Sequence, residues 1–148
     1  MNDTNILKVV NSSKAILRSY STYSHAVVGP DNLVYVTGIL PIDKTSAIPK
    51  LIQGGIEEQL DQVMVYLKAI LETAGSCLNN VVKTRLSLKH LSDKNAINEN
   101  YKKYFNSPYP ARLYVQCEET ALVSMPHILT FYFLIRTNIH AHNKVLLC

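Results

Sequence analysis

One arginine stands where a charged side chain meets an apolar strand. Arg112 lies within the run PYPARLYV, residues 108–115, and the apolar residues around it predict a buried strand. A guanidinium group is permanently charged and costly to desolvate alone, and its planar fork matches a carboxylate with two parallel hydrogen bonds. The position therefore predicts a pocket for a small organic acid. The alternative is a structural arginine whose stem covers the strand end beside an Asp or Glu.

Residues that could bind a metal ion are sparse. His140 and His142 are separated by one residue and could coordinate a metal, but two ligands near the end of the chain make a weak site. The three cysteines are widely separated and have no paired spacing of the kind that binds zinc. The sequence therefore predicts no metal site.

Composition limits the class of protein. The chain has 148 residues, of which 47% are hydrophobic and 18% charged, which is typical of one folded domain. No apolar run approaches the ~20 residues that span a bilayer. The net charge of +4 is scattered without a basic block, so we expect neither nucleic acid nor a membrane as a partner. Residues 1–10 lack a secretory signal pattern, which predicts a cytoplasmic protein.

Six segments have the composition of β-strands, because each combines β-branched or aromatic residues with flanking turn residues. They are residues 6–10, 25–28, 33–37, 81–88, 111–117 and 127–136. The sequence GPDN at 29–32 predicts a hairpin between the second and third strands. In the fourth segment, Val82, Thr84, Leu86 and Leu88 alternate with their neighbours, which predicts a half-buried strand.

Two helices separate the later strands. Apolar residues recur every three or four positions from Ile56 to Ala74, and Gly75 follows, as expected for an amphipathic helix with a glycine cap. Ser92 is the predicted cap of a second helix that stops before Pro108. Strands, helix, strand, helix and strands in this order predict an α+β fold, with two helices on one face of a mixed sheet.

Five short segments occur in an order and spacing that belong together. They are YSHAV at 23–27, YVTG at 35–38, KAILETAG at 68–75, NxxYxxYF at 98–105 and YPAR at 109–112. Together they resemble the reactive intermediate deaminase family, also called RidA or YjgF. The resemblance extends from about Lys14 to Arg136.

The resemblance implies a fold, an assembly and a reaction. It implies a chorismate-mutase-like fold and a homotrimer with three sites in the clefts between subunits. The implied reaction is hydrolysis of reactive 2-imino acids to 2-oxo acids and ammonia, without a metal or organic cofactor. By matching position, Arg112 is expected to grip the substrate carboxylate, with help from the backbone around Tyr114. Tyr23, Thr37 and Asn98 are expected to line the cleft and place substrate and water.

The last strand departs from the family pattern. Family deaminases carry there a glutamate thought to hold the attacking water, whereas this chain has no Asp or Glu after Glu119. Counting from Arg112 without a gap puts His127 at the glutamate's place, and two inserted residues put Leu129 there. A neutral imidazole accepts a proton near neutral pH, so His127 is the candidate catalytic base. A structural histidine is the alternative.

Three functions remain open from the sequence. The first is a deaminase with weakened or altered water activation, which the retained Arg112 and Asn98 favour. The second is a non-catalytic trimer that binds small carboxylates as a sensor or partner protein, which the missing glutamate favours. The third, a ribonuclease or translation inhibitor, lacks a basic groove and a catalytic His pair. We expect one domain at residues 1–136 and a C-terminal extension at residues 137–148.

Overall fold

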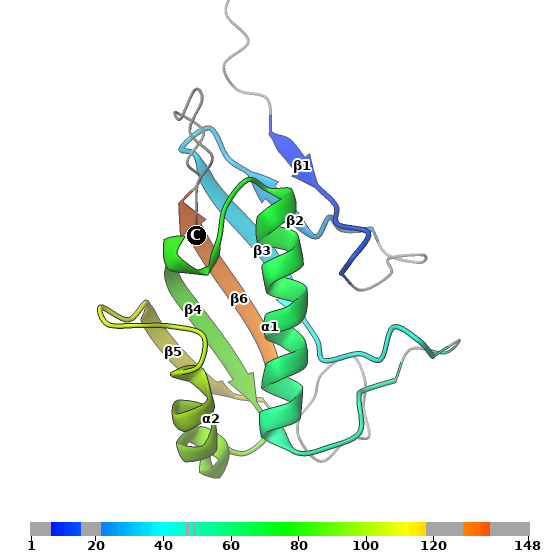
Figure 1. Cartoon of the computed structure of the whole chain (residues 1–148), viewed down its shortest axis with the longest axis vertical. Helices are drawn as coiled ribbons and strands as arrows, with labels where there is room; N and C mark the ends of the chain where they lie inside the picture. Colours follow the sequence, from blue (N-terminus) through cyan, green and yellow to red (C-terminus); the bar gives the residue numbers. More distant parts are fainter. Residues whose placement is uncertain (1–6, 16–21, 47, 49, 118–128, 137–148) are drawn as a thin grey trace, which may run out of the picture.

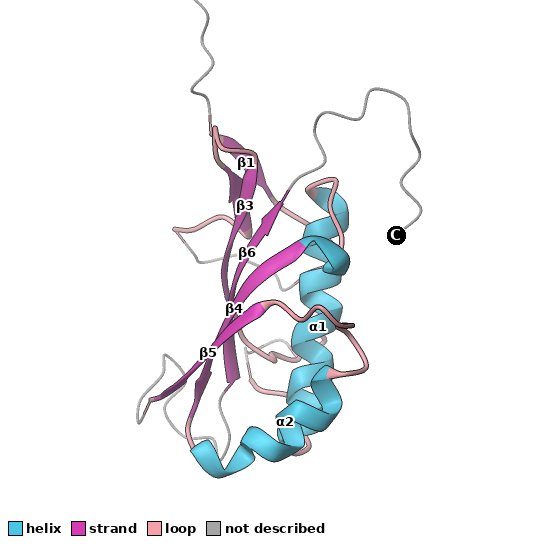
Figure 2. Ribbon diagram, turned by 90° about the vertical axis from the view of Figure 1, so that its left-hand side faces the viewer, coloured by secondary structure: helices cyan, strands magenta, loops and turns pink. Residues whose placement is uncertain are grey.

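The computed structural model describes residues 7–15, 22–46, 48, 50–117 and 129–136. A six-stranded mixed sheet forms its centre, and two helices pack on the same face of that sheet (Figures 1 and 2). The predicted α+β class is therefore confirmed. Within the described ranges, no helix combines the length and the apolar character that crossing a membrane requires.

The sheet brings together strands that are far apart in sequence. The strands are β1 (Lys8–Val10), β2 (Ala26–Val28), β3 (Leu33–Ile39), β4 (Val81–Leu88), β5 (Ala111–Gln116) and β6 (Leu129–Arg136). Their order is β1-β2-β3-β6-β4-β5, and every neighbouring pair is antiparallel except β4 and β5, which are parallel. A parallel pair needs a long crossover, and the second helix lies in that crossover.

The predicted hairpin joins β2 and β3. Its turn is closed by the backbone N–H of Gly29, which donates to the carbonyl oxygen of Leu33 at 2.9 Å. Asn32 adopts a left-handed conformation with φ of 58°, which asparagine tolerates. The sequence predicted that the third strand ends at Thr37, but β3 continues to Ile39, because its pairing with β6 resumes there after a register shift.

Helix α1 (Ile56–Thr73) provides much of the core beneath the sheet. Its apolar stripe is buried as the sequence predicted, and Leu67 is completely buried. The Glu58 carboxylate accepts a hydrogen bond from the backbone N–H of Gly55 at 2.8 Å, which closes the first turn. The chain leaves the helix at Gly75, whose φ of 74° belongs to the left-handed region that glycine enters without strain.

The burial pattern of β4 differs from the predicted alternation at its first residues. Val81 is 7% exposed and Val82 is 37% exposed, so the first valine and not the second faces the core. The cause is a register shift between Val81 and Lys83 in the pairing with β6. Such a bulge inserts one residue and reverses the alternation, which the sequence pattern alone does not reveal. From Thr84 onward the predicted face is buried.

A short 3₁₀ turn, Leu91–Asp93, leads into helix α2 (Lys94–Tyr101). Ser92 lies inside this turn, so the prediction that it caps the helix is wrong. Asp93 occupies the N-cap position and makes no capping hydrogen bond with its side chain. The 3₁₀ turn begins at Leu91, before the predicted cap, and the α-helix begins after it, at Lys94.

A polar clamp joins the two helices. The Asp61 carboxylate on α1 accepts hydrogen bonds from the Asn100 amide at 2.7 Å and from the Tyr104 hydroxyl at 2.6 Å. The same Asn100 amide nitrogen donates to the carbonyl oxygen of Glu57 at 3.0 Å. These three bonds form the α1–α2 clamp, and they fix how α2 lies beside β5.

Candidate active site

The face of α2 that meets β5 presents polar and aromatic side chains. Lys94, Asn98 and Tyr101 follow one another at helical spacings of four and three, so they share one face of the helix. Arg112 and Tyr114 are two residues apart on β5 and therefore point to one side of the strand. Their partners on β4 are buried residues of the helix-covered face, so these two side chains also face the helices.

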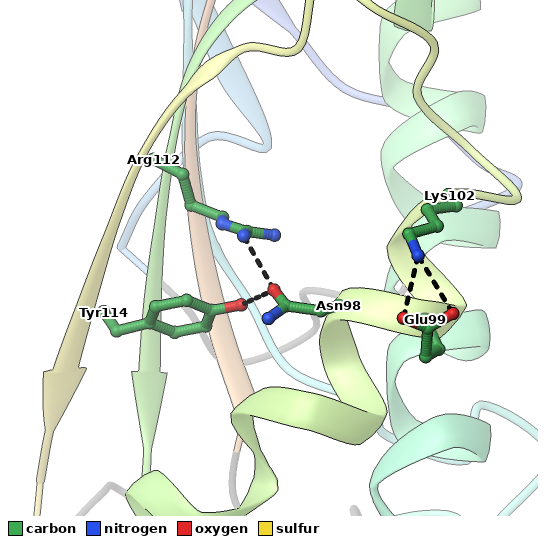
Figure 3. A network of polar contacts seen from close by, with 5 residues as sticks. All are labelled: Asn98, Glu99, Lys102, Arg112 and Tyr114. Atoms are coloured by element: carbon green, nitrogen blue, oxygen red, sulfur yellow. Dashed lines mark hydrogen bonds and ion pairs between the residues drawn. The ribbon is translucent and has the colours of Figure 1, made fainter.

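Arg112 is held by one amide and two aromatic rings. Its Nη2 donates to Oδ1 of Asn98 at 2.7 Å (Figure 3). The guanidinium carbon lies 4.7 Å from the centroid of the Tyr101 ring and 4.9 Å from that of Tyr114. These are the distances of cation–π contacts, which hold the guanidinium plane without neutralising its charge.

The prediction that Arg112 begins a buried strand is wrong for this chain. Strand β5 lies at the edge of the sheet with one neighbour, and Arg112 is exposed. Among the residues that the structure describes, no carboxylate forms an ion pair with Arg112; its hydrogen-bond acceptor is the uncharged amide of Asn98. The structural alternative, an arginine tied to an Asp or Glu, finds no support in the described part of the chain.

Asn98 on α2 binds two side chains of β5. Its Oδ1 accepts hydrogen bonds from Arg112 and from the Tyr114 hydroxyl, the latter at 3.0 Å. Two donors on one oxygen fix the amide orientation, because the NH₂ group of asparagine cannot accept either bond. Asn98 therefore orients the guanidinium and ties α2 to β5.

The tyrosines of this site remain uncharged at physiological pH. Burial raises the pKa of Tyr101, whose hydroxyl lies 3.1 Å from the Thr84 hydroxyl. Burial also raises the pKa of Tyr114, although the positive charge of Arg112 acts in the opposite direction. Neutral phenols add hydrogen-bonding capacity without adding negative charge. They therefore do not compensate the positive charge of Arg112.

A cleft of about 380 Å³ opens beside Arg112. Its described lining residues come from α2, the segment that follows α2 and the start of β5: Asn98, Glu99, Tyr101, Lys102, Tyr109, Pro110 and Arg112. Both carboxylate oxygens of Glu99 accept hydrogen bonds from the Lys102 ammonium, at 2.8 and 3.0 Å, which raises the pKa of Lys102. A volume of this size suits a small organic molecule.

Two residues predicted to line the cleft lie elsewhere in the chain. Tyr23 precedes β2 and is 47% exposed, and Thr37 is half-buried on β3. Strands β6 and β4 separate β3 from β5 in the sheet. Neither residue lines the cleft that contains Arg112, so the structure of one chain brings together Asn98, Arg112 and Tyr114 but not Tyr23 or Thr37.

The two candidates for the missing glutamate's place have different outcomes. His127 lies outside the described residues. Leu129 begins β6 and pairs with Leu88, whereas Arg112 pairs with Thr84, four positions earlier on β4. Four strand residues span about 13 Å, and β4 also lies between β6 and β5. The Leu129 backbone is therefore remote from the Arg112 of the same chain.

Sequence reasoning missed part of the cleft. Tyr101 was noted as part of a motif, but its ring contact with Arg112 was not predicted. Glu99 and Lys102 were not considered as cleft residues. Lys102 lies four positions after Asn98 and three after Glu99, and this spacing was a usable signal, since positions one turn apart on a helix share a face. The contribution of Tyr109 and Pro110 depends on the path of the segment before β5, which spacing does not reveal.

Comparisons with known proteins agree on one family. A family model described as Endoribonuclease L-PSP matches residues 13–125. RutC family protein UK114 of Drosophila melanogaster is 37% identical over 122 residues, covering 82% of this chain and 83% of that protein. Human 2-iminobutanoate/2-iminopropanoate deaminase is 37% identical over 107 residues, covering 72% and 75%. The crystal structure of RidA from the Antarctic bacterium Psychrobacter sp. has a TM-score of 0.72 at 35% identity, covering 87% and 98%. This chain belongs to the RidA/YjgF family, whose sequence model carries the description Endoribonuclease L-PSP.

Proposed function

We propose that the chain hydrolyses reactive 2-imino acids to 2-oxo acids and ammonia. The observation that carries the proposal is the state of Arg112, which is exposed at a cleft and bonded to a neutral amide instead of a carboxylate. A guanidinium in this state is suited to an anionic ligand. Relatives named 2-iminobutanoate/2-iminopropanoate deaminase, from human and rat, share 37% and 39% identity with the chain over 107 residues each.

The reaction makes modest demands on a protein. A protonated 2-imino acid and one water give a 2-oxo acid and an ammonium ion, so atoms and charge balance without a further reactant. The protein must hold the carboxylate, place the water and assist proton transfer. In our proposal Arg112 holds the carboxylate, while Asn98 and Tyr114 keep the guanidinium oriented. The last strand lacks the family's glutamate, so we propose weaker or altered water activation, with His127 as the candidate base.

We further propose that three chains assemble and that the site is completed between them. The sheet face opposite the helices carries exposed apolar side chains, among them Val9, Tyr35 and Leu113, with exposed fractions of 56%, 47% and 51%. A monomer would leave this surface in water, and assembly would bury it. In a trimer, Tyr23 and Thr37 of a neighbouring subunit would supply the cleft residues that one chain does not bring to Arg112.

A second candidate is a non-catalytic trimer that binds small carboxylates as a sensor or partner protein. The absence of any Asp or Glu after Glu119 favours it, because binding needs Arg112 but not a water-activating acid. A ribonuclease is the least supported function, since the basic residues are scattered along the chain.

The decisive experiment follows the decay of 2-iminobutanoate, released in situ by a dehydratase, with and without the purified chain. We expect the imine to decay faster with the chain than without it. We expect this acceleration to be smaller than that produced by a relative that keeps the last-strand acid. If the chain binds 2-oxobutanoate but does not accelerate imine decay, the deaminase proposal fails and the sensor proposal takes its place. Cleavage of RNA by the same preparation, without any effect on the imine, would overturn both.

A further inference from the structure

The cleft beside Arg112 also contains a carboxylate. Among its described lining residues, Glu99 supplies the one carboxylate. Glu99 directly follows Asn98 on α2, and Oδ1 of Asn98 lies 2.7 Å from Nη2 of Arg112. Arg112 and Glu99 both belong to the lining of this cleft, one from β5 and the other from α2. A cation-binding group and an anion-binding group therefore line one small cleft (Figure 3).

Glu99 already binds a nitrogen cation. Both of its carboxylate oxygens accept hydrogen bonds from the Lys102 ammonium, at 2.8 and 3.0 Å. A protonated amine is the group that a 2-amino acid carries, and a protonated imine is its close analogue. The Glu99 carboxylate is therefore able to accept the same hydrogen bonds from the nitrogen of a ligand in place of Lys102.

The Glu99–Lys102 pair is suited to being displaced. The Glu99 and Lys102 side chains are 74% and 57% exposed, and exposed ion pairs contribute little stability. A ligand held at Arg112 by its carboxylate presents its nitrogen to Glu99 at a high effective concentration. The tethered nitrogen therefore competes well with Lys102, whose long side chain loses little when it returns to solvent.

We infer that Glu99 binds the cationic nitrogen of the ligand while Arg112 binds its carboxylate, so that the cleft selects 2-iminium and 2-amino acids over 2-oxo acids. This inference rests on the proposed function and names a specificity residue for it. The selected form is the useful one, because the protonated imine is the form that water attacks. A 2-oxo acid product lacks the positive charge and is released more easily.

A matched pair of stable ligands tests the inference by binding alone. 2-Aminobutanoate and 2-oxobutanoate have the same carbon skeleton and carboxylate, and differ at the group that Glu99 is inferred to recognise. Both are titrated calorimetrically into the full chain at neutral pH, and the ratio of the two affinities is the readout. The ratio cancels general effects of a substitution on the cleft.

We expect three variants to change the affinity ratio in different ways. Glu99→Gln keeps the shape but removes the charge, and we expect the amino acid's advantage to fall about three- to thirtyfold. Lys102→Met removes the competitor, and we expect the advantage to rise. Glu72→Gln removes an exposed carboxylate at the far end of α1 and should leave the ratio unchanged. Circular dichroism of each variant establishes that it is folded.

The outcomes separate this inference from the proposed function. An unchanged ratio in Glu99→Gln, while Arg112 still binds 2-oxobutanoate, overturns the inference and leaves the deaminase in place. A fall in both affinities by the same factor also overturns it, since that shows a general effect on the cleft. If the wild-type chain binds neither acid, the proposed function fails and the inference fails with it.

Discussion

Arg112 is distinguished from an ordinary structural arginine by the chemistry of its neighbours. Two neutral rings and one amide hold the guanidinium in place, so its position is fixed while its charge is not compensated by a described carboxylate. The sequence predicted that Arg112 binds an anion, because a permanent charge beside apolar residues is costly. It could not predict the ring contacts, which depend on how α2 packs against β5.

Replacing Arg112 tests the carboxylate grip. Arg112→Ala should lower the affinity for 2-oxobutanoate about tenfold or more, because a charge-assisted bidentate contact is lost. Arg112→Lys should recover little of it, since an ammonium lacks the planar fork that lies between the two rings. Titration calorimetry measures both. Lys68→Ala removes an exposed cation from α1 and is the matched control. Unchanged affinity in Arg112→Ala would identify a structural arginine.

The neutral amide of Asn98 has its own test. Asn98→Asp keeps the size of the side chain but places a carboxylate where the amide oxygen accepts from Arg112. We expect the affinity for 2-oxobutanoate to fall about tenfold at neutral pH, because the new carboxylate neutralises the guanidinium. The deficit should shrink only as the pH falls below about 4, because the adjacent guanidinium holds the pKa of the new aspartate below its usual value of about 3.9. A deficit that does not change with pH would point to distortion of the cleft instead of charge neutralisation.

At the scale of elements, the position of α2 decides whether a cleft exists. In the α1–α2 clamp, Asp61 accepts hydrogen bonds from Asn100 and Tyr104. The clamp holds α2 beside Arg112. Asp61→Ala leaves two donors without their acceptor, so we expect a loss of about 1–3 kcal/mol in the free energy of unfolding. The affinity for 2-oxobutanoate should fall as well. Tyr104→Phe, which removes one bond of the clamp, should have a smaller effect on both.

Chemical denaturation measures the effect on stability, and titration with 2-oxobutanoate measures the effect on binding. If Asp61→Ala is less stable but binds 2-oxobutanoate as wild type does, the clamp stabilises the fold without positioning the cleft. Stability equal to that of wild type would mean that the helix contact depends on apolar packing.

The tyrosines that connect α2, β4 and β5 predict a dependence of stability on alkaline pH. Burial raises the pKa of Tyr101 and Tyr114 above the usual 10.0, so the folded chain keeps protons that the unfolded chain releases. Their contribution to stability is complete below pH 10 and is lost as the pH rises through the folded-state values. Urea unfolding at pH 9 and pH 11 measures this loss. Tyr101→Phe should reduce it, and an equal loss in that variant would exclude Tyr101 as a cause.

How far the elements could be predicted depends on whether each one follows from local pattern. Helix α1 was predictable because its apolar spacing, its acidic start and Gly75 all agree. The exposure of Val82 was not, because a bulge in the pairing with β6 has no local signal. The exposure of Arg112 was not either, since an apolar strand at the sheet edge has the same sequence pattern as a buried one. Interactions between elements decide these features.

At the scale of the whole molecule, the described chain supplies one part of the predicted site. Arg112 and Asn98 lie together on the helix-covered side, while Tyr23 and Thr37 belong to the other end of the sheet order. Residues so separated meet at one cleft only if a second copy brings them there. The sequence resemblance predicts a site divided between subunits, and the contribution of Tyr23 and Thr37 from a neighbouring copy is part of our proposal.

The last prediction concerns the open face of the sheet. Leu113 is 51% exposed and points away from the helices, so Leu113→Glu places a charge on the surface that a trimer would bury. We expect the wild-type chain to have the mass of three copies by light scattering at micromolar concentration, and the variant to have the mass of one. Val65→Glu is the matched control, because Val65 is 58% exposed on α1 and its replacement should leave the trimer intact. Imine hydrolysis should disappear together with the trimer in Leu113→Glu, while circular dichroism still reports a folded chain. An active monomer would show that the Arg112 cleft is complete in one chain and would remove the need for Tyr23 and Thr37 from a neighbour.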